Sequence, residues 1–115
     1  MKKINLQPAL VSMDHDEDIL YAVIGAFIQE VPALTAQLLE ALQNRDQTSA
    51  KRVSHTLKGN FRILQLQSQQ TCWAKIESLA HEGDFDQITS LLPEAKRVTE
   101  EVLSQLQAEL DTHES

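Results

Sequence analysis

A histidine in the middle of a basic segment is the residue in this sequence best suited to chemistry. His55 stands in the run His55-Thr56-Leu57-Lys58-Gly59. At about 100° per residue of helix, Val53 and Leu57 lie roughly 160° to either side of His55. The imidazole is therefore predicted to point away from the apolar stripe. An exposed imidazole beside a lysine suits transient phosphorylation, because the cation stabilises the phosphoryl oxygens.

The charges of the chain are distributed unevenly. The net charge is −7, yet residues 47–76 contain no acid and five basic residues: Lys51, Arg52, Lys58, Arg62 and Lys75. All of these except Lys75 fall within about 60° of His55 on a helix. A segment whose charges are all positive favours an anionic partner, and the residues expected to contact this partner are Lys51, Arg52 and Arg62. Alternatively, a basic helix simply balances acidic neighbours within the fold.

Gly59 is the second unusual residue near His55. In the middle of a helix, glycine costs about 1 kcal/mol relative to alanine. A helix that carries this cost usually needs another backbone to come close. Because Gly59 falls on the His55 face rather than on the core stripe, access for a visiting protein is favoured. Packing against a neighbouring helix is the alternative.

A carboxylate is predicted to lie beside His55. If a turn is centred near residue 66, an antiparallel hairpin brings Glu77 level with His55. A carboxylate there can accept the Nδ1–H of the imidazole, fix its tautomer and leave Nε2 free as a nucleophile. Alternatively, Glu77 pairs with Lys51 or Lys58 at the surface, and the sequence does not separate these interpretations.

Apolar residues follow helical spacing along almost the whole chain. Asp14 and Glu17 fit a capping box at the start of a long helix, and Pro32 is expected to kink or split that helix. Residues 66–68 are the expected turn after the basic helix, Gly83 a C-cap, and the polar residues 111–115 a frayed tail. The predicted elements are a short lead-in over 4–13, a helix behind the capping box whose apolar residues run from 20 to 42, the basic helix over 47–65, and two helices whose apolar residues run from 72 to 80 and from 85 to 110.

Four amphipathic helices with short connections predict an all-α protein, an antiparallel four-helix bundle with a short N-terminal lead-in helix. The length of 115 residues suits one domain over 1–115. An aromatic content of 4% and only three glycines and three prolines argue against an all-β fold.

The sequence around His55 resembles a known family. His55-Thr56-Leu57-Lys58-Gly59 matches the H-x-L-K-G core of histidine phosphotransfer (HPt) domains, which relay phosphate between receiver domains. The resemblance extends over nearly the whole chain. It implies that His55 is phosphorylated, that Lys58 stabilises the phosphate and that Gly59 admits the partner. It also places Glu77 where the family commonly has a Glu or Gln that hydrogen-bonds the histidine.

Three residues depart from the family pattern after the motif. The family usually has small residues there, followed by a glycine ten positions beyond the histidine. Here Phe61 and Arg62 are bulky, and position 65 is Gln. Phe61 lies toward the core stripe, whereas Arg62 lies on the His55 face, where it narrows the docking surface or adds a contact to the phosphate. These departures leave the chemical groups of the motif intact, but they leave the identity of the partner open.

Other functions find little support in the sequence. The other histidines, His15, His81 and His113, lack the spacing of a metal pair, and we expect no metal site. Cys72 is expected to pack in the core. No Gly-rich phosphate loop is present, so the chain is not expected to be an autonomous kinase. The acidic net charge disfavours nucleic acid, the longest apolar run (21–28) is too short to cross a bilayer, and a single cysteine suits the cytoplasm.

The sequence therefore predicts a cytoplasmic, monomeric phosphorelay intermediate. It would accept a phosphoryl group on His55 from a receiver aspartate and pass it to another receiver domain. The expected partners are receiver domains, which supply their own Mg²⁺, and a hybrid sensor histidine kinase as a further candidate. Met1 and the lead-in favour a free-standing protein. The alternatives are an adaptor that binds receiver or other acidic domains without phosphorylation, and an accessory bundle in which the basic face only balances charge.

Overall fold

Helices form all the regular structure in the part of the chain that the computed structural model describes, residues 3–114. In order along the chain they are α1 (Gln7–Ser12), α2 (Glu17–Gln43), α3 (Gln47–Ile63), α4 (Gln67–Glu82) and α5 (Phe85–Glu114).

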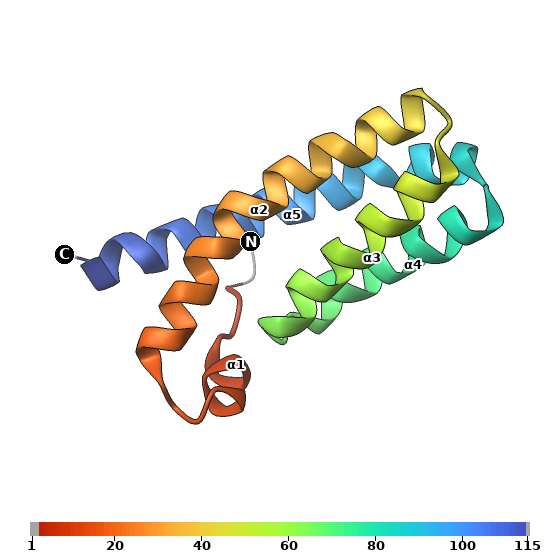
Figure 1. Ribbon diagram of the computed structural model, residues 1–115. Helices are drawn as coiled ribbons and strands as arrows, with labels where there is room; N and C mark the ends of the chain where they lie inside the picture. The colour runs from red at the N-terminus through yellow and green to blue at the C-terminus, as the bar shows by residue number, and fades with distance from the viewer. Residues whose placement is uncertain (1–2, 115) are drawn as a thin grey trace.

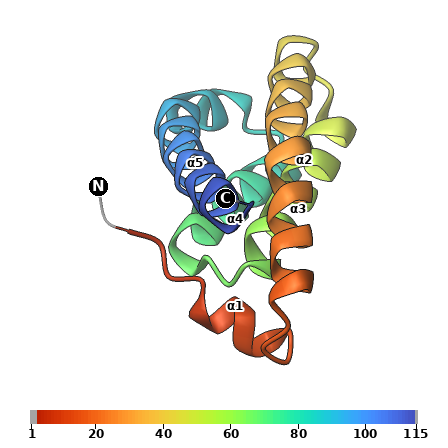
Figure 2. The same ribbon diagram turned by 90° about the vertical axis from the view of Figure 1, so that its left-hand side faces the viewer.

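The four long helices form the predicted antiparallel bundle. α3 packs against α2 and α4, and α5 packs against α4 and α2, so each long helix has two neighbours. α2 and α5 run beyond the ends of α3 and α4, and α1 folds back beside the first turns of α2 (Figures 1 and 2). The fold class predicted from the spacing of apolar residues, including the lead-in helix, is confirmed.

The inward stripe of α3 determines which of its residues face solvent. The apolar residues predicted for this stripe are fully buried: Ala50, Val53, Leu57, Phe61 and Leu64. The Phe61 ring meets the Phe27 ring of α2 edge to face, with 5.0 Å between centroids. Phe61, one of the departures from the family pattern, thus fills the interface between α2 and α3.

The inward face of α4 carries the single tryptophan of the chain. Trp73 is 1% exposed, and its indole N–H donates a hydrogen bond of 3.2 Å to the hydroxyl of Thr99 on α5. Because both polar groups are buried, this bond satisfies them within the core. The neighbouring Cys72 is half-buried and packs against the core, as expected, and burial raises the pKa of its thiol.

The start of α2 differs from the prediction. Its N-cap is Asp16, whose side chain accepts a hydrogen bond from the backbone N–H of Ile19, and not Asp14. Asp14 and His15 instead adopt left-handed backbone conformations, with φ of 55° and 60°, in the turn that follows α1. Because the N-cap needs an extended backbone, Asp14 cannot fill that position.

Pro32 does not split α2, which continues from Glu17 to Gln43. The axis of the helix bends along its length (Figure 1), as expected where a proline removes one backbone hydrogen bond. By length and composition α2 is also able to cross a membrane. The core helix of a bundle passes the same test, and the buried stripe of α2, with Ile24, Phe27 and Val31, packs in this core.

The connection between α3 and α4 comes earlier than predicted. α3 ends at Ile63, and the turn is formed by residues 64–66 rather than 66–68. Gln65 adopts a left-handed conformation with φ of 57°, and the N–H of Leu66 bonds to the carbonyl of Phe61 at 3.1 Å. This is a Schellman motif, in which glycine usually occupies the left-handed position. The turn was misplaced because Gln carries no signal for that conformation.

Of the two predictions made for residues that flank or end α5, one is confirmed and one is wrong. Gly83, which precedes α5, adopts the expected left-handed C-cap of α4 with φ of 71°. Residues 111–114, predicted to fray, continue the helix. The imidazole of His113 stacks on the ring of Tyr21 with 3.7 Å between centroids, and this contact holds the last turn against α2. Ser115, the last residue of the predicted tail, lies outside the described residues.

Candidate functional site

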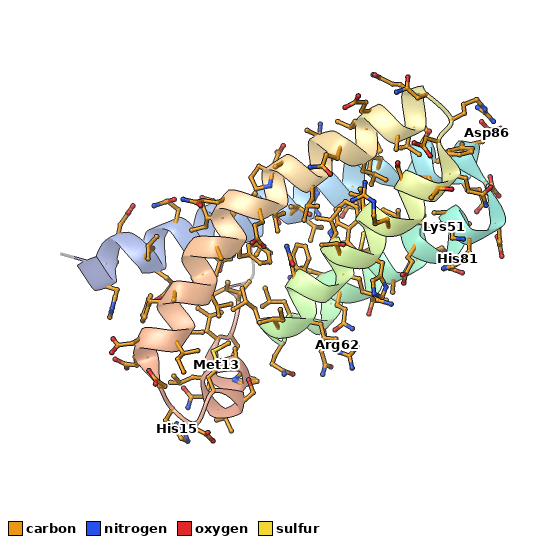
Figure 3. The ribbon with its side chains drawn as sticks, in the orientation of Figure 1. Met13, His15, Lys51, Arg62, His81 and Asp86 are labelled. Carbon is orange, nitrogen blue, oxygen red and sulfur yellow. The ribbon has the colours of Figure 1, made fainter. Side chains whose placement is uncertain are left out.

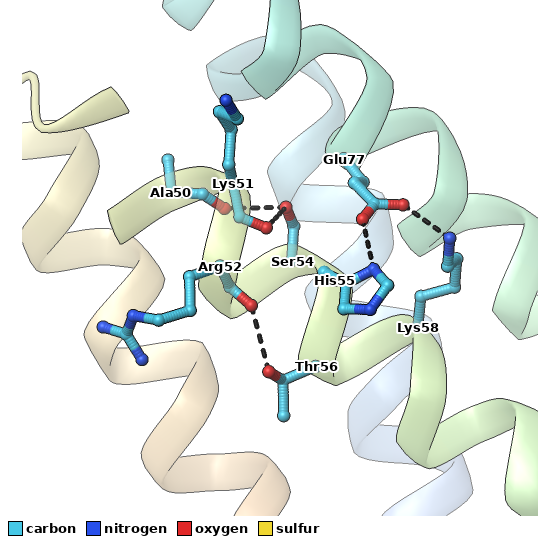
Figure 4. Close-up of polar contacts among 8 residues, drawn as sticks. All are labelled: Ala50, Lys51, Arg52, Ser54, His55, Thr56, Lys58 and Glu77. Carbon is cyan, nitrogen blue, oxygen red and sulfur yellow. Dashed lines mark hydrogen bonds and ion pairs between the residues drawn. The ribbon is translucent and has the colours of Figure 1, made fainter. Parts of the chain in front are cut away.

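His55 lies on the outward face of α3, as the sequence predicted. Its side chain is 69% exposed. Nδ1 lies 2.6 Å from Oε2 of Glu77 on α4, within hydrogen-bonding distance (Figure 4). An ionised carboxylate only accepts hydrogen bonds, so this contact places a proton on Nδ1 and leaves the lone pair of the neutral ring on Nε2. The nitrogen away from Glu77 is therefore the nucleophilic one.

The same carboxylate also holds Lys58. Nζ of Lys58 donates to Oε1 of Glu77 at 2.6 Å, so the two oxygens of Glu77 bind two different side chains of α3. The sequence left open whether Glu77 orients His55 or pairs with a lysine, and the structure shows both contacts. Lys58 is less exposed than expected, at 24%, because it folds toward α4 to reach Glu77.

The carboxylate of Glu77 is well suited to remain ionised. Its side chain is 13% exposed. This burial raises the pKa of Glu77, but hydrogen bonds from Lys58 and His55 outweigh it, so the pKa is lowered overall from 4.5. Glu77 is therefore an anion at neutral pH, and it presents a fixed acceptor to the imidazole.

One side chain at the start of α3 joins α3 to α4, and another caps α3 itself. The amide of Gln47 donates to the backbone carbonyls of Ala80 and His81, each at 3.0 Å, and so joins the first turn of α3 to the last turn of α4. Asp46 caps α3 by accepting from the N–H and hydroxyl of Ser49. The Gln47 bonds support the register that brings Glu77 to His55. Sequence reasoning missed the role of Gln47, because a surface glutamine carries no motif.

Gly59 is open to solvent rather than to another helix. A Cβ built at Gly59 would have no atom within 4 Å. The alternative that α3 needs this glycine to pack against a neighbouring helix is therefore wrong. The space lies one turn beyond His55 on the same side of α3 and is free for a group from outside the chain.

The other basic residues of α3 differ in their surroundings. Lys51 and Arg62 lie along the outer side of α3 (Figure 3), and neither forms an ion pair with any residue of the described range 3–114. Arg52 lines a hollow of about 190 Å³ between the end of α2 and the start of α3, which Asp46 also lines. Arg52 thus partly balances an acid within the fold, whereas Lys51 and Arg62 do not.

The arrangement supports one kind of chemistry. It offers an exposed nucleophilic nitrogen, an anion that fixes the opposite nitrogen, a lysine one turn away and an open space for an incoming group. Phosphoryl transfer mainly needs positioning and charge stabilisation, which these groups supply.

Comparison with known proteins identifies the family of this chain. A search of curated proteins finds no match. Among solved structures, the histidine-containing phosphotransfer protein HptB from Pseudomonas aeruginosa PAO1 is similar, with a TM-score of 0.83 and 19% identity over 92% of this chain and 93% of that one. At this identity the likeness shows the fold. The family model of the Hpt domain matches residues 22–114. Because that match runs from the first turns of α2 to the end of α5 and so includes every helix of the bundle, the chain belongs to the Hpt domain family.

Proposed function

We propose that this protein is a phosphorelay intermediate that carries a phosphoryl group on Nε2 of His55. The observation that carries the proposal is the contact of 2.6 Å between Nδ1 of His55 and Glu77, on a side chain that is 69% exposed. This contact supports Nε2 as the nucleophile, and the exposure lets a second protein reach it.

The proposed reaction is a displacement at phosphorus. The lone pair of Nε2 attacks the phosphorus of a phosphorylated receiver aspartate, the bond between phosphorus and the aspartate oxygen breaks, and the carboxylate leaves with the electron pair. The aspartate of a second receiver reverses the step, and the electron pair of the N–P bond returns to Nε2. Lys58 would move from Glu77 to the phosphoryl oxygens, and the Mg²⁺ of each step belongs to the receiver.

The surface around His55 supports an acidic partner. Lys51 and Arg62 lack ion pairs within residues 3–114 and flank the imidazole along α3, and Arg52 lies on the side nearer α2. An acidic receiver pocket complements this charge and would be steered toward it. We propose that residues 1–115 act as one monomeric unit in the cytoplasm, with receivers and a hybrid sensor kinase as partners and no ATP site of their own.

A mixing experiment tests the function. A receiver domain carrying ³²P on its aspartate is incubated with the wild-type protein, with His55→Gln and with the matched control His81→Gln, which removes an exposed histidine from α4. We expect acid-labile, base-stable label on the wild type and on His81→Gln, and none on His55→Gln. A wild type that stays unlabelled with every receiver of its genome but still binds them would support the adaptor instead. Label on His55→Gln would overturn the site.

A further inference from the structure

We infer that Glu77 also acts on the phosphorylated protein, as a positioning residue that keeps the proton on Nδ1 of His55 and so keeps the ring ready to release its phosphoryl group. This inference rests on the proposed function, because it assumes that His55 carries a phosphoryl group on Nε2. It concerns the release of that group rather than its acceptance.

The argument begins with the places available to the ring proton. In the unmodified neutral ring, one of two nitrogens carries the proton. Once Nε2 of His55 is bonded to phosphorus, Nδ1 is the only nitrogen left for it. Nδ1 lies 2.6 Å from Oε2 of Glu77. If Nδ1 lost its proton, its lone pair would face an ionised carboxylate oxygen at that distance, and two acceptors would repel each other.

Glu77 is held in the ionised state by its second contact. Lys58 donates to Oε1 at 2.6 Å, and Glu77 is mostly buried between α3 and α4. The hydrogen bonds to the carboxylate outweigh its burial, and the pKa of Glu77 is lowered. Loss of the proton from Nδ1 is therefore unfavourable, because the bare nitrogen would face a carboxylate oxygen. Transfer of that proton to Glu77 is also unfavourable, because the pKa of this carboxyl is lowered.

The other charged groups on the helices around the ring differ in sign. Lys51, Arg52 and Lys58 on α3 are positive and act in the opposite sense to Glu77. Glu30, the one charged residue of α2 between Asp18 and Glu40, is negative, and on α4 the titratable residue one turn beyond Glu77 is His81. Positive neighbours favour loss of the ring proton. Glu77 is in direct contact with Nδ1, so it opposes them at the shortest distance.

Retention of this proton has a chemical consequence. When an oxygen of water or of an acceptor aspartate attacks phosphorus, the N–P bond breaks and its electron pair goes to Nε2. A ring protonated on Nδ1 leaves as neutral imidazole, whereas an unprotonated ring must leave as an anion. The protonated form is the better leaving group, and a carboxylate that preserves it extends fast release to higher pH.

The test avoids receivers altogether. The wild type, Glu77→Gln and the matched control Glu82→Gln, which removes an exposed carboxyl from the same helix, are phosphorylated with potassium phosphoramidate, which transfers its phosphoryl group to the imidazole and releases ammonia. Loss of phosphate is then followed by ³¹P NMR from pH 6 to pH 9. Glutamine keeps an acceptor oxygen for Nδ1–H but removes the charge.

The rate of phosphate loss should fall as the pH rises and the ring loses its proton. We expect this fall to occur at lower pH in Glu77→Gln than in the wild type and in Glu82→Gln. At pH 8 we expect Glu77→Gln to lose phosphate about three- to tenfold more slowly, since an adjacent opposite charge shifts a titration by about one pH unit when partly exposed. Glu77→Gln also weakens the contact that holds Lys58, and a freed Lys58 could bind the phosphoryl oxygens. That effect would slow hydrolysis by the same factor at every pH. A shift of the pH profile therefore identifies the ring proton as the cause.

Two outcomes would overturn the inference while leaving the proposed function intact. One is a Glu77→Gln profile that coincides with the wild type. The other, which needs no variant, is a ¹⁵N spectrum of phosphorylated wild type showing an unprotonated Nδ1 at pH 7. A wild type that takes no phosphoryl group on His55 from phosphoramidate or from any receiver would instead reject the proposed function.

Discussion

Nδ1 of His55 and Oε2 of Glu77 lie 2.6 Å apart, although 22 residues separate the two in the chain. The contact joins the middle of α3 to the outward edge of α4, so it forms only when these helices pack in the observed register. The orientation of the His55 ring is therefore a property of the folded bundle and not of the local motif.

Lys58→Ala should slow phosphoryl transfer to His55 with little loss of stability. The ammonium group of Lys58 and the ring of His55 contact the same carboxylate, so the ammonium can reach a phosphoryl group on the ring, and its removal should cost about tenfold in rate. The Lys58–Glu77 pair is partly exposed, so we expect the free energy of unfolding to fall by less than about 1 kcal/mol. Single-turnover transfer from a labelled receiver and urea unfolding measure the two effects. A loss of several kcal/mol would show that Lys58 has a structural role.

Gly59→Ala should stabilise the protein and impair transfer. The added methyl group meets nothing within 4 Å, so the gain in helix propensity, about 1 kcal/mol, should appear in thermal unfolding. It also occupies the space through which a receiver would approach His55. Gly25→Ala is the control, because a Cβ there likewise meets nothing within 4 Å, in α2. Equal transfer rates for the two variants would count against a docking role for Gly59.

Gln65→Gly should raise the stability of the bundle. Gln65 has φ of 57° in the Schellman motif that ends α3, a conformation that costs a side-chain-bearing residue about 1 kcal/mol and glycine almost nothing. We expect a gain of about 0.5–1 kcal/mol in urea unfolding, with transfer unchanged. Gln29→Gly, at an exposed position in the middle of α2, should lose about 1 kcal/mol. Destabilisation by both would show that position 65 tolerates Gln without strain.

The stabilising effect of Glu77 should disappear in acid. Its pKa is lowered in the folded protein from 4.5, so the folded state binds this proton less readily than the unfolded chain does. The contribution of Glu77 is therefore present above about pH 4.5 and lost as the pH falls through the lowered pKa. The difference in free energy of unfolding between wild type and Glu77→Gln should shrink from pH 6 to pH 3. A difference independent of pH would contradict the ion pair.

Sequence reasoning predicted the features of this protein that depend on periodicity. The spacing around Val53 and Leu57 located the core stripe of α3, and that stripe implied the exposure of His55. The position of Glu77 beside His55 followed from hairpin symmetry about residue 66, although the observed turn of residues 64–66 is centred one residue earlier. An error of that size moves a residue by less than one turn, and a glutamate side chain spans the difference.

Features that depend on tertiary contacts could not be predicted in this way. The bond from Gln47 to the end of α4 and the stacking of His113 on Tyr21 join residues whose types carry no signal. The left-handed residues Asp14 and Gln65 were missed because non-glycine residues rarely adopt that conformation. Backbone hydrogen bonds within each turn accompany this conformation, from the N–H of Asp14 to the carbonyl of Val11 at 3.1 Å and from the N–H of Gln65 to the carbonyl of Arg62 at 3.0 Å.

The openness of the site at His55 has a kinetic consequence for the proposed relay. The side chain of His55 is 69% exposed, and a Cβ built at Gly59 would meet no atom of the described residues within 4 Å. A phosphoryl group placed there would stand in water between encounters. The yield of the proposed relay would then be a race between hydrolysis and collision with the next receiver, so the fraction of phosphoryl groups delivered would rise with the concentration of receivers.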